Sequence, residues 1–419
     1  MSAIRFFDQV LSAPKGYTSG THRTRSPRDT VTAYLPLAPR MGITRVANIT
    51  GLDSIGLPVY TAIRPNSRSL ATSQGKGLDA PAAKASALME TIETWHAEHV
   101  ESPLRWDSYA SLRRNASVVD VSQLIQLRNR VVHWDAPRAW IQGFDLMAEE
   151  PVWVPYDYVS LYFVSDGGVN PIPFRQSSTG VSSGNHLLEA MTHGFCEVIE
   201  RDAEVYWTQT KGRIRIDLDT VDDPGCRCVL DLIARAGVYA AAWDMTTDIG
   251  VPAYSAMIMD PPDTGAWRRH GAYSGFGCHL SPGIALLRAL TEAVQSRVTF
   301  IAGSRDDMFR RDYTSLQLDE GQRIRWQELT RPAKFYPFSM RSSIASDTFE
   351  GDVSTILSRL ASVGVKSSIV VDLSKPEIDI PVVKVIVPGL DETGEDHRMG
   401  PRGQQAMRVA AQPQQGSPS

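Results

Sequence analysis

The feature that most constrains this chain is a repeat: a Gly/Ser-rich loop followed by a helix-forming segment that carries Glu-x-x-Glu. The two pairs are Glu90 with Glu93 and Glu197 with Glu200, each at the same distance after a glycine, Gly77 or Gly184. Carboxylates three residues apart lie on one face of a helix. Two such helices that face each other gather four carboxylates, which are oxygen ligands suited to divalent metal ions. Because the loops before them are rich in backbone N–H groups, the repeat predicts a site for a metal–nucleotide complex.

The residues around the two Glu pairs help to decide between a solvated helix face and a binding site. An isolated Glu-x-x-Glu is usually a solvated face, and that is the alternative for either pair taken alone. Here apolar residues are interleaved with the carboxylates: Leu88, Met89, Ile92 and Trp95 around the first pair, and Phe195, Cys196, Val198 and Ile199 around the second. Such neighbours indicate half-buried helices, and a buried carboxylate needs a cation or a metal ion as its partner.

The two loops carry a weaker signal than the helices. The segment SQGKG, which contains Lys76, lacks the spacing of a Walker A loop and of the dinucleotide-binding fingerprint. Lys76 is a candidate phosphate contact by its place before the first helix, with a solvated lysine in a turn as the equal alternative. Ser182 and Asn185 are suited to capping the second helix. Glu189, one turn later, either completes a capping box or meets a ribose hydroxyl.

A third stretch repeats the arrangement in part, with Glu292 and Gln295 on a helix just before Arg297. Two other arginines, Arg23 and Arg201, would join Arg297 in offsetting the charge of a polyphosphate. For Arg201 and Arg297 the alternative is an ion pair with a neighbouring glutamate. The sequence has no H-E-x-x-H motif and no ordered Ser/His/Asp set, so it does not support nucleophilic catalysis by its own side chains.

Composition excludes several classes of protein. The 419 residues carry a net charge near −4, which argues against wholesale nucleic-acid binding. Four cysteines are too few for a disulfide framework. The N-terminus has no signal-peptide core, and no run reaches the ~18 apolar residues of a membrane span. We therefore expect a cytoplasmic protein that makes no membrane contact.

Helix and strand signals alternate irregularly along the chain, which predicts an α+β or mixed α/β fold. We expect helices over 82–99 and 186–208, a β-hairpin within 43–65, two strands within 238–260, and a helix followed by two strands near the C-terminus. Three parts are predicted: an N-terminal segment of residues 1–60 that contributes to the nucleotide site, a catalytic domain over 61–395, and a disordered tail over 396–419. The tail is rich in Gln, Pro, Gly and Ser.

Taken together, these motifs resemble those of the YcaO family, from about Arg23 to Gly389. That family builds its ATP site from two E-x-x-E helices and an S-x-x-N-x-x-x-E segment, which here is Ser182, Asn185 and Glu189. The resemblance implies that the four glutamates hold two Mg²⁺ ions bridging the phosphates, and that the Ser/Asn/Glu segment contacts the nucleoside. It also implies the YcaO fold, in which β-sheets pack against the Glu-bearing helices.

The same resemblance implies four further ATP contacts and several binding partners. It implies that Arg201 and Arg297 contact the phosphates, and that Arg23 and Thr30 stand where family members often have Lys and Ser. The segments GTHR, ITRVANITGLDSIGLPV and AGSRDDM are most similar to the branch that works with a TfuA partner protein. A precursor peptide as substrate and a homodimer are further implications of the family.

The activity implied by the resemblance is ATP-dependent O-phosphorylation of peptide backbone amides, in the modification of ribosomally synthesised peptides. Thioamide formation with a TfuA-type partner is the favoured outcome, and a stand-alone cyclodehydratase that forms azolines or a macroamidine is the alternative. A nucleotide-binding accessory protein without chemistry of its own is the alternative of another class. The chain ends in QPQQGSPS and lacks the Pro-x-Pro-x-Pro tail of many azoline-forming members, which disfavours the ordinary cyclodehydratase role.

Overall fold

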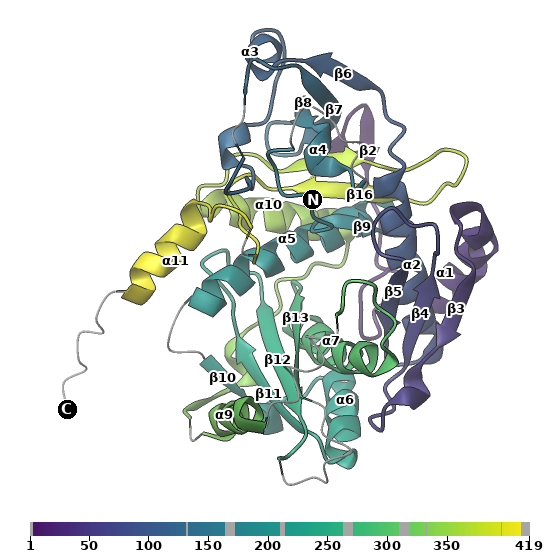
Figure 1. Cartoon of the computed structure of the whole chain (residues 1–419), viewed down its shortest axis with the longest axis vertical. Coiled ribbons are helices and arrows are strands. Elements are labelled where there is room, and N and C mark those ends of the chain that lie inside the picture. The colour runs from purple at the N-terminus through teal and green to yellow at the C-terminus, as the bar shows by residue number, and fades with distance from the viewer. Residues whose placement is uncertain are drawn as a thin grey trace.

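The computed structural model describes residues 3–130, 133–163, 172–209, 214–262, 271–309, 319–331, 333–394 and 396–411 (Figure 1). Within these ranges, β-sheets and helices alternate irregularly along the chain. The mixed α/β fold expected from the sequence is confirmed.

One sheet is antiparallel and consists of β3 (Arg45–Asn48), β4 (Val59–Ile63) and β5 (Thr72–Lys76). The chain then enters α2 (Ala80–Glu98), which packs on β4 and β5. The predicted hairpin and the predicted helix over 82–99 are confirmed. Before this unit in the sequence comes α1 (Pro27–Tyr34), which is capped by Ser26: the Ser26 hydroxyl accepts a hydrogen bond from the backbone N–H of Asp29.

A second sheet has the order β13 (Ala272–Cys278), β12 (Ala253–Met259), β11 (Tyr239–Asp244), β10 (Ile214–Asp217) and β14 (Phe335–Pro337). Helix α7 (Pro282–Ala302) packs on β12 and β13, with α6 (Pro224–Arg235) beside it. Helix α9 (Asp319–Thr330) precedes β14. The succession β11–β12–β13–α7 repeats the arrangement β3–β4–β5–α2: three antiparallel strands in chain order, then a long helix.

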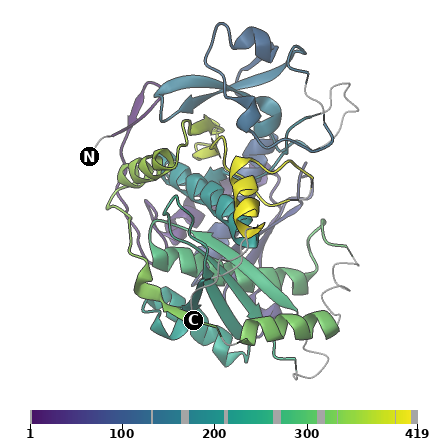
Figure 2. The same cartoon turned by 90° about the vertical axis from the view of Figure 1, so that its left-hand side faces the viewer.

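The third sheet has the order β6 (Leu104–Asp107), β7 (Arg138–Asp145), β15 (Ile369–Asp372), β16 (Val382–Ile386) and β9 (Val181–Ser183), and β8 (Glu150–Pro155) pairs with β7. Helix α5 (Leu187–Gln209) packs on β9 and β16, and α10 (Phe349–Ser362) packs on α5. In Figures 1 and 2, α5 runs through the middle of the molecule. Its Phe195, Ile199 and Ala203 are buried, so this helix is a core element, as its apolar residues predicted.

The remaining short elements lie between these units. They are β1 (Ile4–Phe6), β2 (Gln9–Leu11), α3 (Tyr109–Leu112), α4 (Tyr156–Val159) and 3₁₀ turns at Leu35–Met41, Thr50–Leu52, Val121–Gln123, Leu218–Thr220 and Phe338–Met340. All four cysteines are free thiols. Across the described ranges, the search for a helix both long enough and apolar enough to cross a membrane finds none.

The Gly-rich stretches predicted as loops are largely strands, which corrects the sequence analysis. SQGK belongs to β5, VSS forms β9, and YSGFGC belongs to β13. A Cβ on Gly75 would lie 1.9 Å from the backbone nitrogen of Ala87 in α2, and one on Gly275 would lie 2.3 Å from that of Ala293 in α7. Only glycine lets each strand approach its helix so closely. These glycines therefore serve strand–helix packing.

The tail predicted as disordered from residue 396 contains a helix, α11 (Pro401–Ala411), while residues 412–419 lie outside the described part of the chain. Figure 2 shows α11 lying against α5. Arg402 Nε donates to both carboxylate oxygens of Asp202, at 3.1 and 2.9 Å, and Arg402 Nη2 donates to Asp248 at 2.6 Å. Composition predicted disorder, but charge-assisted hydrogen bonds with α5 hold the start of this helix in place.

Candidate functional site

A cavity of about 1100 Å³ lies between α2, α5, α7, β5 and the N-terminal segment. Helix α2 lines it with a stripe at helical spacing: Ala82, Ala85, Ser86, Met89, Glu90, Glu93 and Thr94. Helix α5 contributes Glu189, His193, Glu197, Glu200 and Arg201 at the same kind of spacing. Both Glu-x-x-Glu pairs therefore line one cavity, although they are more than 100 residues apart in the sequence.

The four carboxylates range from the buried Glu200 to Glu90, which is exposed to the cavity. Burial raises the pKa of Glu93 to about 8, although its Oε1 accepts hydrogen bonds from the Ser183 backbone N–H at 2.8 Å and hydroxyl at 2.7 Å. Burial likewise raises the pKa of Glu200 to about 7 and raises that of Glu197. Glu90 reaches into the open volume of the cavity, and the enclosing walls raise its pKa to about 7. Such shifts show that the ionised forms lack full compensation.

An unpartnered atom strengthens the case for a cation site. Glu200 Oε2 is buried and has no hydrogen-bond partner among the described residues, while Oε1 lies 3.6 Å from Arg201 Nη2. The same residues hold no group of three or more carboxylate, imidazole or thiol ligands close enough to surround one ion. This arrangement fits Mg²⁺, which is commonly bound through one or two carboxylates and completes its coordination with phosphate oxygens and water. The donor set thus fits metal that arrives with a polyphosphate.

Basic side chains stand around the carboxylates. Lys76 Nζ donates to Glu292 at 3.1 Å, and Arg201 Nη1 donates to Glu204 at 3.1 Å. Burial alone would raise the pKa of Glu292, but Lys76 and Arg201 hold it below its usual value. Both basic residues line the cavity, and their contact with phosphate stays a prediction.

Arg297 lies elsewhere than the sequence prediction placed it. It is buried outside the cavity wall, where its Nε donates to Asp53 at 3.1 Å and its Nη1 donates to Asp260 at 2.8 Å. The α7 arginine that lines the cavity is Arg288, whose buried Nε has no hydrogen-bond partner within the described ranges. Arg288 precedes Glu292 by one helical turn, so it shares the face of Glu292, whereas Arg297 does not. That spacing is the signal in the sequence that would have pointed to Arg288.

The N-terminal segment closes one end of the cavity around Glu189. Glu189 Oε2 accepts hydrogen bonds from the Thr24 backbone N–H at 2.8 Å and hydroxyl at 2.9 Å, and Arg23 Nε lies 3.6 Å from Glu189 Oε1. Asn185 donates to Glu189 at 3.2 Å and accepts from the Thr30 hydroxyl at 3.1 Å. Arg23, Thr30, Asn185 and Glu189 all line the cavity, which joins residues before position 60 to the later chain in one site.

Ser182 is the second predicted residue that lies elsewhere. Ser182 is fully buried, and its hydroxyl donates to the Ala190 carbonyl at 2.8 Å. A Cβ placed on Gly194 would lie 2.5 Å from the Ser182 Oγ, so this hydroxyl packs directly against α5. Its neighbour Ser183 lines the cavity and holds Glu93. Successive residues of a strand face opposite sides, so within β9 only one of the two serines can face the cavity. Sequence spacing does not decide which one.

The chain is similar to proteins of one known family. Residues 74–391 match the model of a family described as YcaO cyclodehydratase, ATP- and Mg²⁺-binding. The chain is 37% identical, over 98% of its length and all of the relative's, to an uncharacterized protein in the tfuA 3′ region of Rhizobium leguminosarum bv. trifolii.

Two solved structures have the same fold. A YcaO protein from Methanopyrus kandleri bound with AMPPCP and Mg²⁺ has a TM-score of 0.72 at 22% identity, covering 91% of this chain and 95% of that one. A heterocyclase in complex with substrate and cofactor has a TM-score of 0.77 at 23% identity, covering 93% of this chain. The chain spans 55% of the length of that heterocyclase.

Proposed function

The chain belongs to the YcaO family, which binds ATP and Mg²⁺, and we propose that it activates backbone amides of a peptide by transferring the γ-phosphoryl group of ATP to their carbonyl oxygen. The observation that carries this proposal is the single cavity in which four glutamates from α2 and α5 meet the basic residues Lys76, Arg201 and Arg288. Carboxylates suit the metal, and the basic groups suit the phosphates.

In this proposal, Glu90, Glu93, Glu197 and Glu200 hold Mg²⁺, which neutralises charge on the phosphates. Asn185, Glu189, Arg23 and Thr30 hold the nucleoside end. Lys76, Arg201 and Arg288 stabilise the negative charge of the phosphoryl group in transfer, since positioning and electrostatics dominate such reactions. The chain needs no nucleophile of its own, because the amide oxygen is the acceptor.

The phosphorylated amide then reacts with a second nucleophile. Transfer breaks the bond between the γ-phosphorus and the bridging oxygen and forms the amide O–P bond, leaving ADP. The nucleophile adds to the amide carbon, and phosphate leaves with the original oxygen. Sulfide gives a thioamide, a Cys, Ser or Thr side chain of the peptide gives an azoline, and an amine gives an amidine.

We favour thioamide formation with a TfuA-type partner. The supporting observation is the relative encoded in a tfuA 3′ region, because the identity of 37% extends over both whole chains. The second candidate is azoline formation, which the fold likeness to a heterocyclase makes worth testing. In both cases the ATP chemistry is the same, and the second nucleophile decides the product.

The test is reconstitution of the full chain with ATP, Mg²⁺ and each short peptide encoded beside its gene, with and without sulfide and a co-expressed TfuA-type protein. ADP and peptide mass are measured. We expect peptide-dependent ADP formation and replacement of one oxygen by sulfur when sulfide and the partner are present. Loss of one water would instead assign azoline or amidine formation. ADP at background with every peptide would favour a nucleotide-binding accessory protein and refute the proposal.

A further inference from the structure

The cavity has two ends, one near the start of helix α2 and the other near its end. Its lining residues run from Ala82 to Thr94, a distance of about 18 Å at the rise of an α-helix. At the first end, Leu78 meets Leu287 at the start of α7, because both side chains lie within 3.3 Å of a Cβ placed on Gly20. At the second end, the Thr72 hydroxyl donates to the Ser304 carbonyl just after α7. Helices α2 and α7 therefore run in the same direction along the cavity.

The first end belongs to the nucleoside if the proposed function holds, on which this inference rests. The N-terminal residues Tyr17–Thr30 border that end, together with Asn185 and Glu189. Glu90 and Glu93 lie nearer the second end, between Met89 and Thr94 of α2. A nucleotide whose nucleoside lies at the first end and whose phosphates point toward the second end has its terminal phosphate at the glutamates. An acceptor amide must then approach that phosphate from the second end.

The second end differs from the rest of the cavity in the chemistry of its wall. Leu70, Leu161, Phe163 and Met308 line it, and Phe163 is 49% exposed. An exposed aromatic at the mouth of a cavity is favourable for contact with an apolar group. Thr94 and Gln176 add polar side chains to the same wall. The Thr94 hydroxyl donates to the Thr91 carbonyl and Gln176 Nε2 to the Ser160 carbonyl, so their side-chain oxygens serve as acceptors for a peptide N–H.

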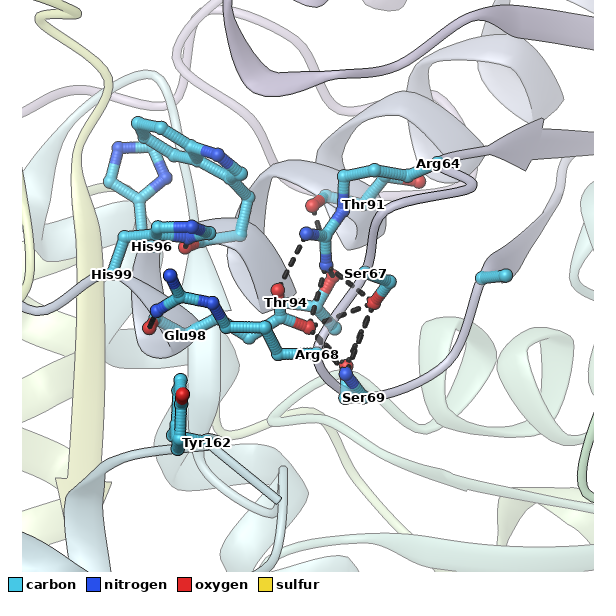
Figure 3. A network of polar contacts seen from close by, with 12 residues as sticks. Arg64, Ser67, Arg68, Ser69, Thr91, Thr94, His96, Glu98, His99 and Tyr162 are labelled. Atoms are coloured by element: carbon cyan, nitrogen blue, oxygen red, sulfur yellow. Dashed lines mark hydrogen bonds and ion pairs between the residues drawn. The ribbon is translucent and has the colours of Figure 1, made fainter. Parts of the chain in front are cut away.

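A buried ion pair holds this wall in shape (Figure 3). Glu98 accepts hydrogen bonds from Arg64 Nη1 and Nη2 at 2.5 and 2.7 Å, from the Ser67 hydroxyl at 2.9 Å and from the Ser69 backbone N–H at 2.9 Å. These bonds fold residues 64–70 back on α2, so that Ser69 and Leu70 face the cavity. Bidentate Arg–carboxylate pairs fix geometry as well as charge.

The neighbouring segment is tied to the same helix. The Leu161 backbone N–H donates to the Ala97 carbonyl at 2.9 Å, and Gln176 Nε2 donates to the Ser160 carbonyl at 3.1 Å. The Arg68 guanidinium lies 4.7 Å from the ring centre of Tyr162, a cation–π contact, and Tyr162 is drawn below Arg68 in Figure 3. The apolar wall is thus built on a hydrogen-bonded frame.

We propose that the second end admits the substrate as an extended peptide segment, and that Leu70, Leu161, Phe163 and Met308 bind an apolar side chain next to the amide that is phosphorylated. The substrate class is therefore a peptide with an apolar residue beside the modified bond. Phe163 is a specificity-determining residue in this arrangement, because it is the wall residue most open to solvent before the peptide binds.

The test measures binding to the full chain in the presence of AMPPCP and Mg²⁺. The probes are two capped pentapeptides of glycine, one with Leu and one with Asp at the centre, titrated by saturation-transfer NMR. We expect the Leu peptide to bind about tenfold more tightly than the Asp peptide, as burial of one aliphatic side chain provides. Phe163→Ala should weaken the Leu peptide about fivefold and leave the affinity for AMPPCP unchanged.

The matched control is Phe335→Ala, since Phe335 is 50% exposed and does not line the cavity; it should change neither affinity. Met308→Ala is a second variant of the wall and should also weaken the Leu peptide. Equal binding of the two peptides, no binding of either, or a Phe163→Ala variant that binds like the unaltered chain would overturn the proposal. If the chain prefers the Leu peptide but forms no ADP with any precursor, the proposed peptide site is supported and the proposed reaction is refuted.

Discussion

At the scale of single residues, Glu93 and Glu200 concentrate negative charge where the protein alone does not neutralise it. Glu93 is held by two hydrogen bonds from Ser183, and Glu200 has one buried oxygen without a partner among the described residues. A fold retains such groups at a cost in stability, so they indicate binding rather than packing.

Replacing either carboxylate should separate activity from folding. Glu93→Gln and Glu200→Gln keep the shape and remove the charge, so we expect turnover to fall by about 100-fold or more, with an unchanged or raised melting temperature. The control is Glu328→Gln, which alters an exposed glutamate of α9. ADP release and thermal denaturation measure the two effects. Full activity in either cavity variant would show that its carboxylate does not hold the metal.

The two arginines of α7 should behave in opposite ways. Arg288→Gln removes a cavity cation, so we expect a weaker affinity for AMPPCP with Mg²⁺ and little change in stability. Arg297→Gln leaves Asp53 buried beside its missing partner, which costs about 3–5 kcal/mol. Calorimetric titration and denaturant unfolding of both variants provide the measurement. A folded Arg297→Gln chain with lost nucleotide affinity and intact Arg288 dependence would restore Arg297 as a phosphate contact.

At the scale of elements, one packing arrangement occurs twice. Strand β5 lies against α2 through Gly75, and β13 lies against α7 through Gly275. In each case the glycine lets the helix come close enough for its carboxylates to reach the cavity beside the sheet. The likeness between the first and third Gly-rich stretches of the sequence is thus a likeness of strand–helix contacts. The segment SQGK is part of β5, and its Lys76 lines the cavity.

Gly75→Ala and Gly275→Ala should therefore reduce stability. The new Cβ would meet helix backbone at 1.9 and 2.3 Å, and backbone cannot move aside cheaply. We expect a loss of about 1–3 kcal/mol or more, or failure to fold. Gly51→Ala is the control, because nothing lies within 4 Å of its Cβ. Denaturant unfolding is the measurement, and a stable Gly75→Ala chain that has lost only nucleotide affinity would support a phosphate loop after all.

At the scale of the whole molecule, the site exists only where three separate units meet. Helices α2, α5 and α7 come from different parts of the chain, and α1 with the segment before it closes the end of the cavity that Asn185 and Glu189 border. Among the described residues that line the cavity, carboxylates outnumber lysines and arginines. Because some of these carboxyl groups have raised pKa values, the stability of the metal-free protein depends on pH. The homodimer implied by the family stays a prediction, which light scattering in solution would test.

The sign of that pH dependence follows from the pKa shifts. Burial raises the pKa of Glu93 to about 8 and of Glu200 to about 7, above their values in the unfolded chain. The metal-free fold then holds more protons than the unfolded chain, so its stability falls as the pH rises from about 5 to about 8. Metal needs the ionised carboxylates and displaces these protons. We expect Mg²⁺ with AMPPCP to raise the melting temperature more at about pH 8.5 than at about pH 6.

Differential scanning fluorimetry at both pH values measures this effect. The control variant is Glu93→Gln, which should reduce the difference between the two pH values because one titrating group is gone. AMPPCP with EDTA should produce a smaller gain at both. An equal gain at both pH values in the unaltered chain would contradict the assignment of these carboxyls to the metal.

The sequence by itself determined which helices bear the site. Apolar residues at helical spacing and carboxylates three apart are local patterns, so α2 and α5 and their four glutamates followed from them. Thr30 came only from the resemblance to a known family. Only the tertiary structure decided what depends on contacts between distant segments. Strand alternation places Ser182 inside the protein and Ser183 at the cavity. The packing of α7 pairs Arg297 with Asp53 and Asp260. Hydrogen bonds to Asp202 hold a helix in a tail whose composition is typical of disorder. The physical reason is that the periodicity of the sequence determines which residues share one face of a helix or strand, whereas the contacts of that face depend on which segments pack against it.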